Sequence, residues 1–254
     1  MVRTSMIELP YLSYSTPFPP VTQALREPNG LLAFGGDLSV KRLMLAYKHG
    51  IFPWFSDNEP LLWWSPDPRA IIELDGFHRS RSLRKLVRQQ RYKITLNYCF
   101  DEVILHCAKI PRRDINGKHE STDTWITDTM IQAYRQLHEY GFAHSIEVWD
   151  AADQLAGGLY GVGVGKVFCG ESMFHKHPNT SKLAMYALVE HMSRHELAFI
   201  DCQMPTDHLA SLGAVTVPRT EFITRLTRHN QTLDNSGSPM LFYQSCWQKQ
   251  VITL

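Results

Sequence analysis

The sequence lacks the features of membrane-bound and exported proteins. Among its 254 residues there is no apolar run of about 18 residues, so we expect no membrane-spanning helix. No basic start followed by an apolar stretch stands at the N-terminus, so no export signal is predicted. The five cysteines include no C-x-x-C pair, which favours reduced thiols over disulfides or a zinc site. These absences indicate a cytoplasmic protein without a metal site.

The signatures of several large enzyme classes are also missing. The chain contains no P-loop, no dinucleotide-binding fingerprint, no G-x-S-x-G and no H-E-x-x-H. The glycine-rich segment GGLYGVGVGK lies in a predicted hairpin and does not open a helix, which favours a turn over a phosphate-binding loop. His175 and His177 form the closest histidine pair, but no partner cysteine or aspartate stands at metal-ligand spacing.

Acidic residues are absent from residues 76–100, where seven lysines or arginines occur. Setting these seven aside leaves 19 of the 26 basic residues against 25 acidic ones, so the rest of the chain is mildly acidic. A local positive block on such a body is typical of a surface that faces a polyanion. An ordinary solvated helix face is the alternative, and the sequence alone leaves both open.

The order of predicted elements indicates an α+β protein with two parts. Residues 1–75 are rich in proline, glycine and aromatic residues, and we expect a small N-terminal α/β domain around one helix over residues 40–49. Residues 76–230 predict helices, a three-stranded meander over residues 143–174, a helix over 181–195 and a strand over 197–203. This order matches the N-acetyltransferase-like (GNAT-like) fold. Residues 231–254 are irregular, and we expect a surface tail.

The strand segment FIDCQ offers a candidate catalytic pair. Its period of two places Asp201 and Gln203 on one side, with Ile200 and Cys202 on the other. An ionised aspartate beside a glutamine could hold and orient an attacking amine. Capping of the following helix, or a hydrogen bond to a loop, is the alternative explanation for both residues.

Glu171 and the loop tryptophans are candidate ligand contacts. Glu171 stands between Gly170 and Ser172 at the end of an apolar strand, where a carboxylate could pair with a substrate ammonium group. A surface salt bridge, which contributes ~0–1 kcal/mol, is the alternative. Trp54 and Trp125 lie at predicted turns, where they could pack between domains or stack on bases at ~1–3 kcal/mol per base. With the basic block, they make single-stranded nucleic acid a candidate ligand.

A series of sequence blocks carries a family resemblance. In order over about residues 27–222 they include EPNGLLAFGGDLS, GIFPWFS, WWSPDPRA, TWIT, AHSIEVW, GGLYGV, FCGESMF and IDCQ. In these blocks the chain resembles the bacterial leucyl/phenylalanyl-tRNA–protein transferases. The resemblance implies transfer of Leu, Phe or Met from aminoacyl-tRNA to the N-terminal Arg or Lys of an acceptor protein, which marks that protein for N-end-rule degradation. It implies no cofactor, and we expect a monomer.

The resemblance also implies roles for individual residues. Asp201 and Gln203 match the proposed catalytic pair, with Gln203 contacting the amine or the developing oxyanion and Asp201 supporting it. Glu171 matches an acidic residue that meets the positive end of the acceptor, and Trp54 and Trp125 match aromatic residues that hold the terminal adenosine of the tRNA. The side-chain pocket and its neighbouring substrate contacts are matched by Leu159, Phe168, Ser172, Phe174, Met185, Leu188 and Ile200. The surface for the acceptor stem is matched by Arg79, Arg81, Arg84, Lys85 and Arg88.

Two other functions compete with this interpretation. An acyl-CoA N-acyltransferase would share the fold, but the segment GESMFHKHPNTSK lacks the pyrophosphate-binding loop that such an enzyme places before its helix. A tRNA-binding protein without catalytic activity would share the basic block and the aromatic residues. Transfer of the amino acid itself would distinguish the three functions.

Overall fold

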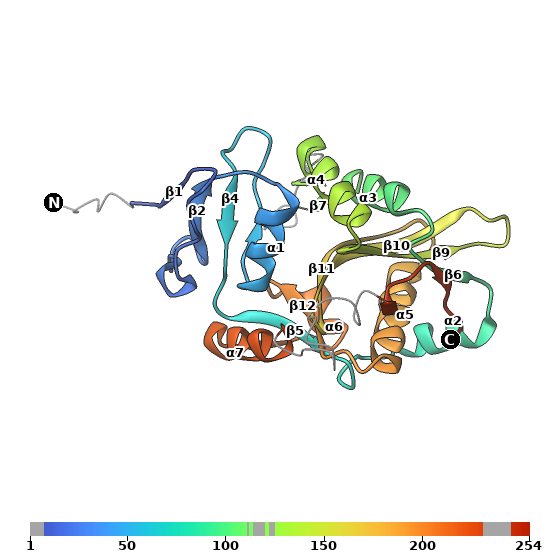
Figure 1. Cartoon of the computed structure of the whole chain (residues 1–254). Helices are drawn as coiled ribbons and strands as arrows, with labels where there is room; N and C mark the ends of the chain where they lie inside the picture. The colour runs from blue at the N-terminus through green and yellow to red at the C-terminus, as the bar shows by residue number, and fades with distance from the viewer. Residues whose placement is uncertain (1–7, 111, 114–119, 122–124, 231–244) are drawn as a thin grey trace.

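The structure, a computed structural model, describes residues 8–110, 112–113, 120–121, 125–230 and 245–254 (Figure 1). Its N-terminal part is a small sheet with the strand order β1 (Tyr11–Leu12), β2 (Leu31–Gly35), β4 (Leu62–Trp64), β3 (Phe52–Pro53). A short 3-10 helix (Val21–Gln23) precedes β2, and α1 (Val40–Lys48) follows it. Helix α1 begins after Ser39, whose hydroxyl accepts a hydrogen bond from the Arg42 backbone N–H (3.3 Å).

A larger, eight-stranded sheet forms the centre of the molecule. Its strand order is β13 (Val215–Val217), β5 (Arg69–Glu73), β12 (Phe199–Gln203), β11 (Val167–His175), β10 (Leu155–Val164), β9 (Ala143–Trp149), β6 (Lys93–Leu96), β14 (Gln250–Val251). Strands β11 and β12 pair in parallel, and the other neighbours pair antiparallel. The meander predicted from the sequence is β9, β10 and β11.

Helices cover both faces of this sheet (Figure 1). On one face pack α3 (Phe100–Ala108) and α4 (Asp128–Glu139), which share a core with α1. On the other pack α5 (Thr180–Arg194) and α2 (Arg81–Gln89). Because both faces are covered, every residue of β9 except Trp149 is buried. The remaining elements are α6 (Asp207–Ser211), α7 (Arg219–Asn230) and a ribbon of β7 (Arg112–Arg113) and β8 (Glu120–Ser121).

Residues 245–254, the described end of the chain, do not form the surface tail that was expected there. Strand β14 pairs with β6 at the sheet edge, and both Trp247 and Ile252 are buried. The Trp247 indole stacks on His144 with ring centroids 4.7 Å apart, and its backbone carbonyl accepts a hydrogen bond from the Asn97 amide (2.6 Å). Burial of a large aromatic ring anchors this segment to the sheet. Residues 231–244 lie outside the described part of the chain.

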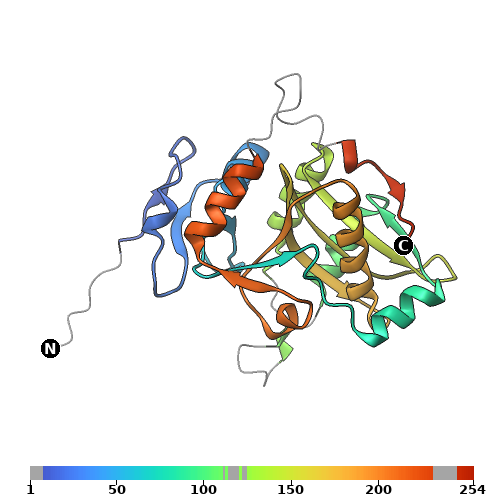
Figure 2. The same cartoon turned by 90° about the horizontal axis from the view of Figure 1, so that it is seen from below.

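The mixed architecture of helices and sheets confirms the coarse fold class. Strand β5 precedes the boundary predicted at residues 75 and 76, yet it belongs to the large sheet. Helix α7, near the other end of the chain, packs against α1 of the N-terminal part (Figure 2). The division into domains at that boundary stays a prediction. Among the described residues, no helix combines the length and the apolar character needed to cross a membrane.

A buried ion pair joins β5 to β12 at the centre of the sheet. The Arg69 guanidinium donates two hydrogen bonds to the Asp201 carboxylate, at 2.8 and 2.7 Å, and each side chain is 1% exposed. Arg69 also donates to the Gly50 carbonyl (3.1 Å) and lies over the rings of Phe52 and Phe222. The pair therefore ties the large sheet to the loop after α1 and to α7, with its charges enclosed by protein.

We predict that Asp201→Asn destabilises the fold, because it leaves the Arg69 charge buried without a counter-charge. The expected loss in the free energy of unfolding is about 3–5 kcal/mol, measured by urea denaturation. The matched control is Asp153→Asn, which breaks an exposed pair with Lys93 (3.4 Å) and is expected to change that free energy by less than about 1 kcal/mol. Equal losses in the two variants would contradict the structural importance of the buried pair.

Candidate active site

A cavity of about 340 Å³ opens between β10, β11, β12, α5 and α6. It lies beside the point where β11 and β12 stop pairing: their parallel register extends only from Val167–Phe199 to Cys169–Asp201. Five of the predicted pocket residues form its apolar wall, namely Leu159, Phe168, Met185, Leu188 and Ile200. The polar residues Glu171, Ser172, Gln203 and Thr206 also line it. The structure thus brings together residues from distant parts of the chain that the sequence analysis had grouped.

A β-bulge in β11 places Glu171 at the cavity. Across from β11, Tyr160 pairs with Ser172 and Gly161 pairs with Gly170, so Glu171 is the extra residue. The bulge also exchanges the two faces of the strand after it. As a result Met173 lines the cavity together with Phe168, whereas Phe174 does not.

Phe174 therefore lies outside the lining of the cavity, away from the other predicted pocket residues. It is 3% exposed and belongs to the core on the other face of the sheet, where its ring stacks on His106 with centroids 4.9 Å apart. A strict period of two would have kept it on the side of Phe168, but the extra residue at Glu171 shifts the alternation by one.

Three donors surround the Glu171 carboxyl group. Tyr47 from α1 donates to Oε1 (2.8 Å), Tyr134 from α4 donates to Oε2 (2.9 Å), and the Gln203 amide donates to Oε1 (3.0 Å). The two tyrosine hydroxyls are also hydrogen-bonded to each other. Burial raises the pKa of Glu171 to about 7. The three hydrogen bonds favour the ionised form and lower this pKa, but burial has the larger effect. Glu171 is thus a cavity carboxyl group held by protein donors, which rules out the surface salt bridge considered for it.

A second irregularity, at the end of β12, separates Asp201 from Gln203. The register with β5 shifts between these residues, and Gln203 adopts a left-handed backbone with φ of +63°. Ile200, Cys202 and Gln203 line the cavity, whereas Asp201 points away to Arg69. The prediction that Asp201 and Gln203 share one side was therefore wrong, because the shift breaks the period of two. The two remain linked, since the Gln203 backbone N–H donates to Asp201 Oδ1 (3.0 Å).

The two candidate tryptophans lie outside the lining of this cavity. Trp54 is 37% exposed, and its ring meets Trp64 edge-on with centroids 5.4 Å apart. Trp125 is half-buried and packs against the core formed with α1, α3 and α4. Exposure leaves Trp54 accessible to a ligand that extends beyond the cavity.

Sequence reasoning missed the tyrosines that hold Glu171. Neither Tyr47 nor Tyr134 was among the candidate site residues predicted from the sequence. A buried tyrosine hydroxyl needs a polar partner, so two such residues were a signal of a buried polar site. Several lining residues were also missed: Ile110, Tyr160, Gly170, Met173, Cys202, Thr206, His208 and Leu209.

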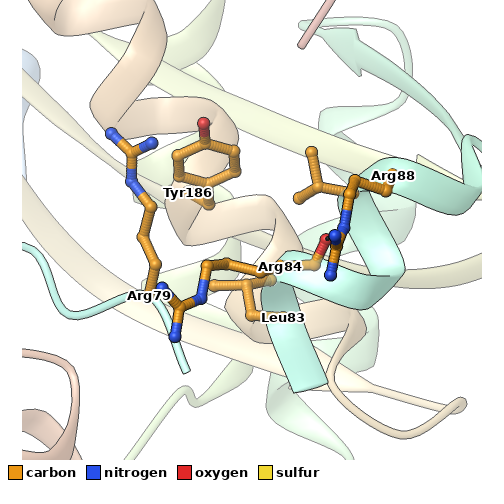
Figure 3. Close-up of a pocket in the computed structure, with 6 residues that line it drawn as sticks. Arg79, Leu83, Arg84, Arg88 and Tyr186 are labelled. Atoms are coloured by element: carbon orange, nitrogen blue, oxygen red, sulfur yellow. Dashed lines mark hydrogen bonds between the residues drawn. The ribbon is translucent and has the colours of Figure 1, made fainter. Parts of the chain in front are cut away.

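Three of the five predicted basic residues border a separate crevice of about 400 Å³ between α2 and α5. Figure 3 shows Arg79, Arg84 and Arg88 around it, with Tyr186 of α5 and Leu83 of α2. Arg79 is paired with Glu190 (3.1 Å) and lies over the Tyr186 ring. The other two predicted contacts, Arg81 and Lys85, are exposed on α2. The basic block therefore forms one exposed surface on the α2 side of the large sheet.

Among solved structures, the chain is similar to L-PGS from Bacillus licheniformis, with 10% identity and a TM-score of 0.37. The match covers 87% of this chain and 65% of that chain, so it spans less than two thirds of that protein's resolved length. A TM-score this low does not establish a shared fold.

Comparison with protein families and curated relatives is far more specific. Residues 71–227 match the family model of the leucyl/phenylalanyl-tRNA protein transferases, and residues 36–67 match the model of that family's N-terminal domain. A leucyl/phenylalanyl-tRNA–protein transferase of Pseudoalteromonas atlantica is 59% identical over 87% of this chain and 91% of its own length. One from Shewanella denitrificans is 47% identical over 98% of this chain and 99% of its own length. The chain therefore belongs to the leucyl/phenylalanyl-tRNA protein transferase family.

Proposed function

We propose that the chain moves a leucyl or phenylalanyl group from aminoacyl-tRNA to the N-terminal amine of an acceptor protein, the reaction that the family name describes. The observation that carries the proposal is the cavity where β11 and β12 diverge, apolar on one wall and bearing the Glu171 carboxyl group on another. The ester of aminoacyl-tRNA is already activated, so the protein's main contribution is to hold amine and ester together. Such positioning lowers a barrier by ~7–11 kcal/mol.

The apolar wall selects the transferred side chain by size. Each buried CH₂ group contributes ~0.8 kcal/mol, so this wall favours Leu, Phe and Met over small or polar side chains. A pocket of this kind separates side chains that differ by one methylene by only ~1–3 kcal/mol. This weak discrimination suits an enzyme that accepts more than one large apolar amino acid.

Glu171 and Gln203 form the polar side of the site and receive the acceptor. An acceptor that begins with Arg or Lys brings two positive charges, which favour contact with a carboxylate in a cavity lined largely by apolar side chains. The Gln203 amide can donate to the oxyanion that develops on the ester carbonyl. Asp201 does not line the cavity, so we assign it a positioning role through its contact with the Gln203 backbone.

The tRNA lies along the basic residues of α2, and Trp54 and Trp125 hold its terminal adenosine. Phosphate contacts by exposed Arg and Lys side chains would supply most of the affinity. We further infer that the large sheet and its helices form the GNAT-like domain, which the parallel β11–β12 pair diverging at the cavity supports. The enzyme acts as a monomer in the cytoplasm.

The proposed reaction predicts that radiolabel from Leu-tRNA enters a protein that begins with Arg. Gln203→Ala should lower the turnover number ~10²–10³-fold if the amide stabilises the oxyanion, with tRNA binding unchanged. The control acceptor is the same protein beginning with Glu, which should remain unlabelled. Labelling that requires acyl-CoA, or tRNA binding without any transfer, would contradict the proposal.

The proposed tRNA surface predicts a salt-dependent effect of charge reversal on α2. Arg84→Glu together with Lys85→Glu should weaken tRNA binding and reduce the slope of log affinity against log salt by about one for each phosphate that is no longer neutralised. The matched control reverses Arg26 and Lys41, two exposed cations of the N-terminal part, and should leave the slope unchanged. Equal slopes in both double variants would remove α2 from the tRNA surface.

A further inference from the structure

Glu171, Tyr47 and Tyr134 form a closed ring of hydrogen bonds. Tyr47 Oη lies 2.8 Å from Glu171 Oε1, and Tyr134 Oη lies 2.9 Å from Glu171 Oε2. The third side of the ring is the hydrogen bond between the two tyrosine hydroxyls. The three groups come from β11, α1 and α4, so the ring closes where the N-terminal part meets the large sheet.

The direction of the hydrogen bonds shows what the ring does for Glu171. Both tyrosine hydroxyls donate to it, one to each carboxyl oxygen. The Gln203 amide donates to Oε1 as well. Hydrogen bonds that a carboxyl group accepts favour its ionised form. The ring therefore holds Glu171 as a carboxylate with both oxygens fixed at the cavity, ready to accept a proton.

The other surroundings of Glu171 act in the opposite direction and favour uptake of a proton. Within the described residues its carboxylate takes part in no ion pair, and the nearby Arg69 guanidinium is bound to Asp201. The other titratable groups that face the ring are Asp201 of β12 and Cys169 of β11, which both disfavour additional negative charge, and Tyr160 of β10. Burial raises the pKa of Glu171 to about 7, so its charge changes near neutral pH, where a general base is most effective.

We propose that Glu171 takes the proton from the α-ammonium group of the acceptor, and that Tyr47 and Tyr134 hold its carboxyl group in position for this step. This inference rests on the proposed function. In the first step an N–H bond of the ammonium breaks, its electron pair stays on nitrogen, and the proton moves to a carboxyl oxygen of Glu171. The nitrogen then attacks the ester carbon. As the C–N bond forms and the C–O bond breaks, a second amine proton leaves with the ribose oxygen of the tRNA. Glu171 finally returns its proton to water.

This assignment makes Glu171 the catalytic base, with Tyr47 and Tyr134 as positioning residues. Only ionised Glu171 can accept a proton, so the reaction needs a pH at or above the midpoint of its titration. Below that midpoint, kcat/KM for the acceptor falls about tenfold per pH unit, because one proton blocks the base. A group with an ordinary carboxylate pKa would not limit the rate at neutral pH.

Infrared spectroscopy of the full chain tests the ring without any substrate. A protonated carboxyl group has a C=O band that a carboxylate lacks, and subtraction of the Glu171→Gln spectrum isolates this band. We expect it to disappear as the pH rises, with a midpoint near 7. Tyr47→Phe and Tyr134→Phe each remove a donor that stabilises the carboxylate, so each should move the midpoint up by about one pH unit. Tyr140→Phe, at an exposed tyrosine of 66%, is the matched control and should not move it.

The rate should follow the same titration. The acidic limb of kcat/KM for a peptide beginning with Arg should shift with the infrared midpoint in both Phe variants, and Glu171→Gln should lose that limb and ~10²–10⁴-fold of the rate. A wild-type midpoint near 4.5, the ordinary value, would overturn the proposal. The proposal would also be overturned if the acidic limb of kcat/KM did not move in Phe variants whose melting temperature equals that of the wild type. If a Phe variant unfolds, the infrared midpoint of Glu171 in the wild type still tests the proposal. A midpoint near 7 without any transfer would reject the proposed function and support the ring.

Discussion

The site depends on the carboxylate of Asp201, which binds both the Arg69 guanidinium and the Gln203 backbone. Its oxygens accept both hydrogen bonds from the buried Arg69 guanidinium, and Oδ1 also accepts the backbone N–H of Gln203. The first contact ties β12 to β5 and to the loop after α1. The second fixes the left-handed turn of the chain at the end of β12, which directs the Gln203 side chain into the cavity. The carboxylate thus shapes the site from outside it.

Glu171 is held from the opposite side of the sheet. Its tyrosine partners come from α1 and α4, which belong to one core, whereas the apolar wall of the cavity belongs to the other core, with α5. The bulge at Glu171 is what allows one residue to connect the two. A carboxyl group in this position is enclosed by donors, yet it still lines a cavity large enough for a bulky side chain.

The sequence predicted what depends on local spacing and missed what depends on pairing between strands. Helix α1 and the meander of β9, β10 and β11 lie where the spacing predicted them, and the apolar wall falls on residues that the family resemblance indicated. The bulge at Glu171 and the register shift after Asp201 exchange strand faces, and they arise from partners far along the chain. For this reason Phe174 and Asp201 were placed on the wrong side. The contact between Tyr47 and Tyr134 could not be predicted for a similar reason, since the two residues are 87 positions apart in the sequence. The end of the chain was misjudged because its two-residue strand, β14, is too short to show a pattern.

The most direct measurement of the central claim is a crystal structure with a non-hydrolysable leucyl-adenosine amide. The account predicts that the leucyl side chain fills the cavity against Leu159, Phe168 and Met185. It also predicts that the carbonyl carbon lies between the Gln203 amide and the Glu171 carboxyl group. A leucyl group bound elsewhere, or a carbonyl oxygen beyond hydrogen-bond distance of Gln203, would contradict it.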